Sequence, residues 1–448
     1  MFVFPCLLST TYCLLIHKMV ELKRTDLRAE RAVLIGALLP KNGVEGESSL
    51  CELERLAETA GAKVIELIVQ KRQSIDPSYY IGKGKALELA AMCSAMDVDV
   101  IICDDDLTPA QVRNLERIIN TKVVDRSELI LHIFATRAKT NQAKLQVELA
   151  QLEYTLPRLR RMWTHLSRIE GGIGTRGPGE KQIESDRRIV AKKINNLKRK
   201  LREGEKRKAR LVEARKDYFT VSLVGYTNAG KSTLLNALTD ADAFVEDKLF
   251  STLDTKTRMC KLSDGGKVLL SDTVGFIRKL PHQLISSFHA TLEEVRSADL
   301  LLHVVDISSP VAVEQADAVN EVLKELGCSD KTTIMALNKA DAIKDEALST
   351  FFRNKYSDCI LMSALKGCGL SELKQRIIEH LGKNQVEINL KCSTGNGKLI
   401  AYLFENGRIL SREFKDETVL FHILISEKHL AKLHKFGSNT IQIIANRE

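Results

Sequence analysis

One short segment constrains the fold of this chain more than any other. It reads Gly225-Tyr226-Thr227-Asn228-Ala229-Gly230-Lys231-Ser232-Thr233. An apolar run with strand character, Phe219–Val224, precedes it, and a run with helical character, Thr233–Leu238, follows. A G-x-x-x-x-G-K-S pattern between a strand and a helix is typical of a phosphate-binding loop. The sequence therefore predicts a P-loop nucleotide site, with these residues around the nucleotide.

The residue types of this loop suit phosphate chemistry. Glycines let the backbone amides turn inward onto the phosphates, and the start of the helix adds its positive dipole end. Lys231 is expected to reach the β- and γ-phosphates as a catalytic group. The Ser232 hydroxyl is expected to be one ligand of Mg²⁺. On its own, this loop leaves kinases, ATPases and GTPases open.

A second motif follows the strand-like run Val268–Leu270. It reads Asp272-Thr273-Val274-Gly275. The Asp272 carboxylate is expected to hold Mg²⁺ through water, and the Gly275 amide is expected to meet the γ-phosphate as part of the catalytic set. Phe276 comes next, where many small GTPases carry a water-positioning glutamine, so we expect slow intrinsic hydrolysis that a partner stimulates.

A third motif selects the base. The strand-like run Thr332–Leu337 leads into Asn338-Lys339-Ala340-Asp341. An aspartate there accepts hydrogen bonds from both donors on guanine's Watson–Crick edge, and adenine would leave that acceptor unpaired. Ser363-Ala364-Leu365 follows another apolar run and is expected to support the base from the other side. GTP and GDP are therefore the expected ligands.

The segment Phe250-Ser251-Thr252-Leu253-Asp254 lies between the first two motifs, where switch I belongs. Thr252 is the candidate for a second hydroxyl on Mg²⁺, ordered by the γ-phosphate and released after hydrolysis. Four motifs in this order match the translation-factor-related class of GTPases. A metabolic phosphotransferase is the alternative from another class, and it would need a lid and an acceptor pocket that the sequence does not display.

The length of 448 residues exceeds what one core supports, so several domains are expected. We expect an α/β multidomain chain with an N-terminal extension (1–25), a small parallel α/β domain (26–139), a basic helical hairpin (140–217), the P-loop GTPase domain (218–383) and a C-terminal ferredoxin-like α+β domain (384–448). Strand-like and helix-like runs alternate from Ala32 to about Arg137, which favours crossovers and a parallel sheet. Residues 386–448 have a β-α-β-β-α-β order.

The hairpin is predicted from two apolar seams of helical period. Leu145, Leu149, Leu152 and Leu156 form one, which is expected to end at Pro157, and Val190, Ile194, Leu197 and Leu201 form the other. Packing of each seam on a neighbouring domain is the alternative. A Gly-rich loop at residues 171–179 lies between them, and the second helix is densely basic. With a net charge of +9, this concentration favours RNA binding over a merely solvated face.

The ten cysteines show no metal-ligand spacing and no disulfide framework, which favours a reducing compartment. Residues 1–16 are apolar or uncharged, but no Lys or Arg precedes them, so a signal peptide is disfavoured and a misassigned start codon is the alternative. No later run is long enough to cross a membrane. Positive charge alone does not separate nucleic acid from an anionic membrane surface, so peripheral membrane association stays open.

The sequence resembles the HflX family of ribosome-associated GTPases, close to the Obg grouping. Phe250–Asp254 with Thr257-Arg258 and Asp272–Ile277 is similar to both groups. The Gly-rich loop followed by Glu180-Lys181-Gln182-Ile183-Glu184-Ser185-Asp186-Arg187-Arg188 resembles HflX in particular. Asn228 is the residue found in potassium-stimulated relatives, so the resemblance implies K⁺ as a possible second cofactor beside Mg²⁺.

The resemblance implies a cytoplasmic, ribosome-associated monomer that binds the large ribosomal subunit and its rRNA. It implies GTP-dependent splitting or recycling of stalled ribosomes under stress, with no DNA partner. A GTPase acting in ribosome assembly or RNA maturation is the runner-up. Family members have been credited with ATP binding by the N-terminal domain, but no second P-loop stands there. The role of the C-terminal domain is left open.

Overall fold

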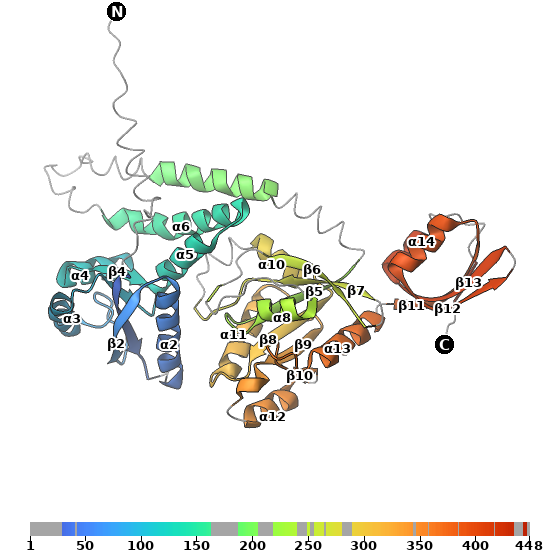
Figure 1. Ribbon diagram of the computed structural model, residues 1–448. Helices are drawn as coiled ribbons and strands as arrows, with labels where there is room; N and C mark the ends of the chain where they lie inside the picture. The colour runs from blue at the N-terminus through green and yellow to red at the C-terminus, as the bar shows by residue number, and fades with distance from the viewer. Residues whose placement is uncertain are drawn as a thin grey trace, which may run out of the picture. The chain divides into compact units, whose positions relative to one another are not determined.

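The computed structural model describes residues 29–40, 43–162, 187–204, 218–239, 249–250, 255–263, 266–279, 289–343, 346–356, 358–383, 385–415, 417–433 and 442–445 (Figure 1). The chain divides into two compact units that meet between Ile130 and Leu131, and each is described by itself. No helix within the described ranges is long and apolar enough to cross a lipid bilayer.

The first unit holds a four-stranded parallel sheet of order β2-β1-β3-β4. Its elements alternate as predicted: β1 (Arg31–Leu38), α2 (Gly43–Thr59), β2 (Lys63–Lys71), α3 (Lys83–Ala95), β3 (Val100–Cys103), α4 (Pro109–Ile119) and β4 (Lys122–Asp125). The central strands are buried almost throughout, as expected for a sheet with covered faces. The predicted parallel α/β arrangement of this region is confirmed.

Local capping explains where two helices of this region begin. Thr108 accepts a hydrogen bond from the Gln111 backbone at the start of α4, and the Gln111 side chain closes a capping box. A further helix, α5 (Arg126–Arg137), follows β4 without a loop and was not predicted. Asp125 starts it, because its carboxylate accepts from the backbone N–H of Glu128 at 2.9 Å.

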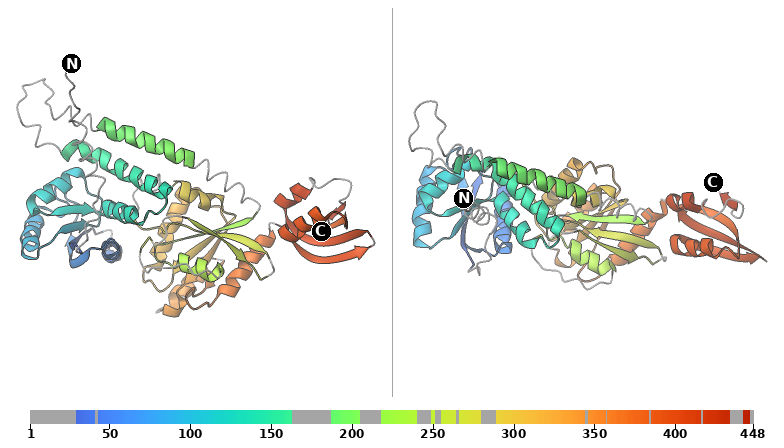
Figure 2. Two further views of the ribbon diagram at one scale, coloured as in Figure 1. Left: turned by 45° about the horizontal axis from the view of Figure 1, so that its top comes forward. Right: turned by 90° about the horizontal axis from the view of Figure 1, so that it is seen from above.

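Two long helices follow α5. α6 (Asn141–Met162) and a helix over residues 187–204 lie side by side (Figures 1 and 2). Their two apolar seams pack into one cluster, which contains Leu145, Leu149, Leu152, Leu156, Val190, Ile194, Leu197 and Leu201. Ion pairs of Glu148 with Lys193 at 2.6 Å and of Glu153 with Lys198 at 2.8 Å join the same helices. The predicted packing of the seams is confirmed; the Gly-rich loop lies outside the described residues.

The predicted helix end at Pro157 is wrong, because α6 continues to Met162 with Pro157 inside it. Proline removes one backbone donor and crowds the preceding turn. The turn gains other support: the Arg158 guanidinium donates to the carbonyl oxygen of Tyr154 at 3.1 Å and stacks 3.4 Å from the centre of its ring. The packed seam also runs through Leu156, so helix–helix packing outweighs the local cost of the proline.

The GTPase region holds a six-stranded sheet of order β10-β9-β8-β5-β7-β6, parallel except for β6. Its strands are β5 (Phe219–Gly225), β6 (Lys256–Lys261), β7 (Lys267–Asp272), β8 (Leu300–Asp306), β9 (Thr333–Asn338) and β10 (Cys359–Leu361). Its helices are α8 (Lys231–Thr239), α10 (His289–Ser297), α11 (Ala312–Glu325), η1 (Ala340–Ala342), α12 (Glu346–Lys355) and α13 (Leu370–Lys383). One core cluster joins α8 and α13 to the sheet, and a second joins α11 and α12 to it.

The C-terminal region is a four-stranded antiparallel sheet of order β12-β13-β11-β14. Its elements are β11 (Gln385–Ser393), α14 (Gly397–Asn406), β12 (Gly407–Lys415), β13 (Thr418–Ser426), α15 (Glu427–Leu433) and β14 (Gln442–Ala445). Residues of β13 alternate between buried and half-buried, as expected for a sheet with one face in a core. This element and strand order is that of the split β-α-β arrangement expected from the sequence.

Candidate nucleotide-binding site

The phosphate loop connects the carboxyl end of β5 to the start of α8. Gly225 has a φ of 151°, and a Cβ there would lie 2.3 Å from the carbonyl oxygen of Val304 on the neighbouring strand. Gly230 has a φ of 95°, and a Cβ there would lie 2.2 Å from the Nδ2 atom of Asn338. Both positions therefore require glycine, because the backbone conformation and the close approach exclude a side chain.

Lys231 is held inside this loop. Its ammonium donates to the carbonyl oxygens of Gly225 at 3.0 Å and Tyr226 at 2.7 Å, and its side chain is buried. Burial lowers the pKa of Lys231 to about 8, and the nearby Asp272 carboxylate partly offsets this. Burial removes the water that would stabilise the charged ammonium. A bound phosphate would stabilise the ammonium instead, because it carries the opposite charge.

Two of the residues expected at Mg²⁺, Ser232 and Asp272, lie together. Ser232 Oγ, on the first turn of α8, donates to Asp272 Oδ2 at 2.6 Å, and Asp272 is fully buried at the end of β7. Thr273 Oγ1 donates to the carbonyl oxygen of Leu223 at 2.7 Å, which ties this strand end to β5. A hydroxyl beside a carboxylate is the hard oxygen set that Mg²⁺ prefers, so these residues fit the ion.

Gly275 lies close to the phosphate loop. A Cβ at this position would lie 2.9 Å from Thr227 Cα and 3.0 Å from Lys231 Nζ. The following residue, Phe276, pairs with the loop backbone: its carbonyl oxygen accepts from Thr227 N at 2.8 Å, and its N–H donates to Gly225 O at 3.1 Å. Its side chain is buried and apolar, so it offers no group to orient a water molecule.

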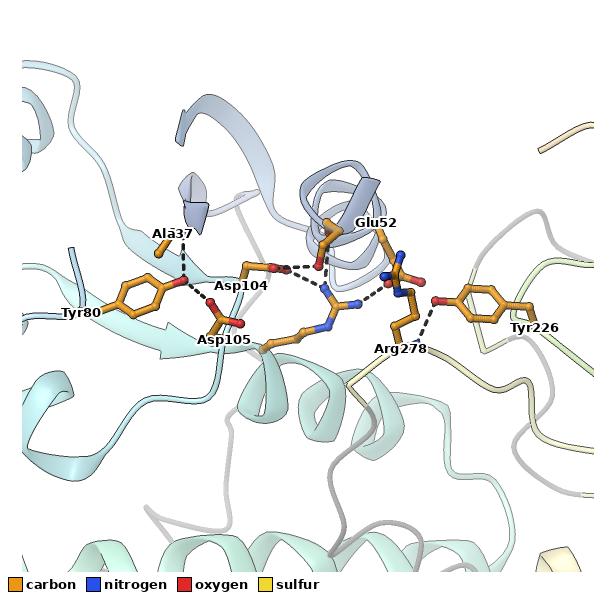
Figure 3. Close-up of polar contacts among 9 residues, drawn as sticks. Ala37, Glu52, Tyr80, Asp104, Asp105, Tyr226 and Arg278 are labelled. Atoms are coloured by element: carbon orange, nitrogen blue, oxygen red, sulfur yellow. Dashed lines mark hydrogen bonds and ion pairs between the residues drawn. The ribbon is translucent and has the colours of Figure 1, made fainter. Parts of the chain in front are cut away.

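Tyr226 supplies a contact that the sequence did not indicate. Its hydroxyl accepts a hydrogen bond from the Arg278 backbone N–H at 2.9 Å, and Figure 3 shows the ring pointing at that backbone. The phosphate loop is thus joined to the segment after Asp-x-x-Gly at Phe276 and again at Arg278. No local pattern marks such a contact, because the two residues are far apart in sequence.

Figure 3 also shows the first unit's Tyr80, whose hydroxyl donates to Asp105 at 2.6 Å and accepts from Ala37 N at 3.1 Å.

The base-selecting loop follows β9. Asn338 Nδ2 donates to the Ala229 carbonyl oxygen at 2.8 Å, and Asn338 Oδ1 accepts from the Ala364 backbone N–H at 2.9 Å. Lys339 has a left-handed backbone with φ 66°, and its ammonium pairs with Asp306 at 2.6 Å. One buried asparagine therefore joins all three predicted loops, from residues 225–233, 338–341 and 363–365.

Asp341 is exposed and accepts a hydrogen bond from the Ser363 hydroxyl. This hydrogen bond, followed by smaller contributions that include the nearby Lys366 and Lys339 charges, lowers the pKa of Asp341. The side chain is therefore an acceptor at neutral pH, as guanine recognition requires. Leu365, beside it, is exposed.

Of the predicted switch I residues, Ser251, Thr252, Leu253 and Asp254 lie outside the described residues, so their roles stay predictions. Phe250 is described; it is buried, with a φ of 55°. Its ring packs against that of Phe134, with 4.5 Å between ring centroids.

A phosphate loop tied through Asn338 to an Asn-Lys-x-Asp loop characterises guanine-nucleotide hydrolases. The chain is accordingly a P-loop GTPase that hydrolyses GTP. The family described as "50S ribosome-binding GTPase" matches residues 220–339. Those described as "GTP-binding GTPase N-terminal" and "GTP-binding GTPase Middle Region" match residues 47–135 and 137–215.

Relatives extend the match to most of the chain. It is 43% identical to the GTPase HflX of Lacrimispora saccharolytica over 420 residues, covering 93% of this chain and 97% of that protein. It is 41% identical to the GTPase HflX of Escherichia coli over 392 residues, covering 87% and 91%. The chain belongs to the HflX family of GTPases. A GTP-binding protein from Sulfolobus solfataricus, solved with GDP, is 26% identical with a TM-score of 0.42, covering 79% of this chain and 99% of that one.

Proposed function

We propose that this GTPase binds the large ribosomal subunit and uses GTP binding and hydrolysis to split or recycle stalled ribosomes. The observation that carries this proposal is the basic surface of the helix over residues 187–204. Val190, Ile194, Leu197 and Leu201 face α6, and the other sides of the helix expose Arg188, Lys192, Arg199, Lys200 and Arg202. Such a basic stripe suits the phosphate backbone of RNA.

The family description points to the same partner, since it names 50S ribosome binding. We also propose that the protein is a cytoplasmic monomer that associates with ribosomes. The proposal also keeps the predicted domain boundaries. They separate the N-terminal domain, the hairpin, the GTPase domain and the C-terminal domain at residues 139/140, 217/218 and 383/384.

We propose that Mg²⁺ is held by the hydroxyls of Ser232 and Thr252, with Asp272 acting through water. The ion would neutralise charge on the phosphates of the nucleotide. Lys231 orients the same phosphates, and the Gly275 amide donates to the γ-phosphate. Asn228, with its left-handed φ of 60°, is proposed to support a K⁺ ion beside the phosphates.

Because Phe276 offers no hydrogen-bonding group, hydrolysis is proposed to depend on a partner for its full rate. GTPase rates with and without large ribosomal subunits test this step. A K⁺-for-Na⁺ exchange at constant ionic strength tests the second cation.

Splitting is tested by incubating intact ribosomes with the full chain and the GTP analogue GMPPNP, followed by sucrose-gradient sedimentation. Free subunits are expected with GMPPNP and not with GDP. Binding to the large subunit without free subunits would instead favour a role in ribosome assembly or RNA maturation. Absence of any co-sedimentation would overturn the ribosome as the partner.

The basic stripe is tested with a variant in which Arg188, Lys192, Arg199 and Arg202 are replaced by glutamine. Co-sedimentation is expected to be lost, because each phosphate contact contributes to a salt-dependent affinity. Intrinsic GTPase activity is expected to be unchanged. Four exposed lysines on other elements serve as the charge-matched control and are expected to leave co-sedimentation intact when neutralised: Lys63, Lys122, Lys261 and Lys324.

A further inference from the structure

Asp306 ends strand β8 beside the base-selecting loop. In the parallel pairing of β8 with β9, Asp306 is the Cα partner of Asn338, and the Ile307 N–H donates to the Asn338 carbonyl oxygen at 3.0 Å. The carboxylate is largely buried, with 17% of the side chain exposed. Asp306 belongs to none of the nucleotide motifs, yet the sheet places it within reach of Lys339.

Both oxygens of the Asp306 carboxylate accept hydrogen bonds. Oδ1 accepts from the Ser308 backbone N–H at 3.1 Å and from the Ser308 hydroxyl at 2.6 Å. Oδ2 accepts from the Lys339 ammonium at 2.6 Å. The two bonds from Ser308 fix the orientation of the carboxylate, so Oδ2 is directed at the ammonium.

The Lys339 ammonium has a second carboxylate nearby, because Asp341 follows two residues later in the same loop. The Ser363 hydrogen bond lowers the pKa of Asp341 most, and the charge of Lys339 contributes to the same shift. Lys339 and Asp341 are therefore close enough to attract each other. In the part of the chain that the structure describes, the ammonium nevertheless pairs with Asp306 and not with Asp341.

An ammonium paired with Asp341 would interfere with recognition of the base. The lysine ammonium carries three N–H donors and no acceptor. It would therefore occupy the carboxylate oxygens that the N1–H and the exocyclic amine of guanine need. Lysine has a flexible stem of four carbons, so its ammonium can turn from one carboxylate to the other. The ion pair with Asp306 removes this competitor from Asp341.

We propose that Asp306 is a positioning residue for guanine specificity, which acts by holding the Lys339 ammonium away from Asp341. The inference rests on the proposed role of Asp341 as the acceptor for guanine. It gives Asp306 a part in selecting the base, separate from the binding of the phosphates.

The variant Asp306→Asn keeps the size of the side chain and removes its charge. A neutral amide holds an ammonium more weakly than a carboxylate does, so Lys339 turns to Asp341. GDP presents two donors to Asp341, whereas inosine diphosphate (IDP) lacks the exocyclic amine and presents only N1–H. Competition at Asp341 therefore weakens GDP more than IDP, and the ratio of the two affinities falls.

The test measures GDP and IDP affinities of the full chain in Mg²⁺ for the wild type, Asp306→Asn, Lys339→Met and the double variant. The wild type is expected to prefer GDP by at least about tenfold, the worth of one charge-assisted hydrogen bond. Asp306→Asn is expected to lower this preference by about three- to tenfold, because that bond is partly lost. Any change in affinity that is common to both diphosphates cancels in the ratio.

The double variant shows whether Asp306 acts through the ammonium. Methionine at position 339 keeps a long unbranched side chain but cannot pair with a carboxylate. The preference of the double variant is therefore expected to match that of Lys339→Met, because no ammonium is left to compete for Asp341.

Asp317→Asn is the matched control. Asp317 on α11 pairs with Lys355 on α12 at 2.9 Å, an ion pair of the same kind outside the nucleotide motifs. Its loss is expected to leave the preference for GDP over IDP as in the wild type.

A purely structural role of Asp306 would lower the melting temperature and weaken GDP and IDP equally, which would overturn the inference. An equal loss of preference on Asp306→Asn with and without Lys339→Met would overturn it as well, because the effect would not pass through the ammonium. A wild type with no preference for GDP over IDP would instead count against the proposed base site, so the two failures are distinguishable.

Discussion

The Nδ2 atom of Asn338 donates a 2.8 Å hydrogen bond to the carbonyl oxygen of Ala229, and this bond joins the base-selecting loop to the phosphate loop. The same side chain accepts from the Ala364 backbone N–H at 2.9 Å. Because Asn338 is buried, neither bond is replaced by water when it is lost. Asn338 therefore helps the sheet to fix the distance between the base site and the phosphate site.

Asn338→Ala is expected to weaken GDP and GTP binding by about ten- to a hundredfold, since it removes two buried hydrogen bonds with a net worth of about 0.5–1.5 kcal/mol each. Asn320 offers a control, because its Nδ2 also donates a hydrogen bond, to the Tyr356 hydroxyl at 3.1 Å, but on α11. Asn320→Ala should leave nucleotide affinity as in the wild type. Equal affinities for Asn338→Ala and the wild type would contradict the structural role given to Asn338.

Gly230→Ala tests the same junction from the other side. A methyl group there would lie 2.2 Å from Asn338 Nδ2 in a backbone with φ 95°, so the Asn338–Ala229 bond must break. We expect loss of measurable GTP hydrolysis and a decrease in the free energy of unfolding of about 1–3 kcal/mol from backbone strain. The measurements are phosphate release and urea denaturation.

The control for that variant is Gly382→Ala on α13. Nothing lies within 4 Å of a Cβ at Gly382, and it has no positive φ. Alanine there is expected to raise stability by about 0.5–1 kcal/mol, the helix preference of alanine over glycine, with normal hydrolysis. A Gly230→Ala protein as active as Gly382→Ala would refute the steric account.

The placement of the phosphate loop, Asp272–Gly275, Asn338–Asp341 and Ser363–Leu365 at strand ends could be predicted from sequence, because each motif is a contiguous run that follows an apolar strand. The apolar seams of the hairpin were equally readable, since Leu145 to Leu156 and Val190 to Leu201 repeat with helical spacing. Helix α5 was missed, although Asp125 caps it, because it begins without a connecting loop. The continuation of α6 through Pro157 was missed because tertiary packing outweighed a local rule.

Contacts between distant residues were beyond sequence reasoning. Tyr226 and Arg278 belong to no common pattern, yet they join the phosphate loop to the segment after Asp-x-x-Gly. Asp306, which pairs with Lys339, also has no local signature. Such partners are fixed only when the sheet places β5, β8 and β9 side by side.

Asp341→Asn should change base preference. The Asp341 carboxylate is held as an acceptor by the Ser363 hydroxyl, and guanine presents two donors to it. The asparagine amide adds an N–H donor at this position. With guanine, this donor faces the exocyclic amine, which is also a donor. With xanthine, it can pair with the carbonyl oxygen that replaces that amine. We expect GTP affinity to fall at least about tenfold, the worth of one charge-assisted bond, and xanthosine triphosphate affinity to rise. Competition between the two nucleotides measures this, and an unchanged preference would remove Asp341 from the base site.

Lys231 should make nucleotide affinity depend on pH. Burial lowers its pKa to about 8 in the nucleotide-free protein, and only the ammonium form pairs with phosphate. GDP affinity should therefore be constant up to about pH 8 and fall by up to about tenfold per pH unit above it, because binding must then take up a proton. In the Lys231→Arg variant the guanidinium stays charged over this pH range. The variant is expected to bind GDP more weakly, but with no break in affinity near pH 8. Titration of the guanine base itself affects the wild type and the variant alike. The stability of the nucleotide-free wild type should rise over the same range, since the unfolded lysine holds its proton up to higher pH. Parallel pH profiles of GDP affinity for the wild type and Lys231→Arg would show that the Lys231 ammonium is not the titrating group.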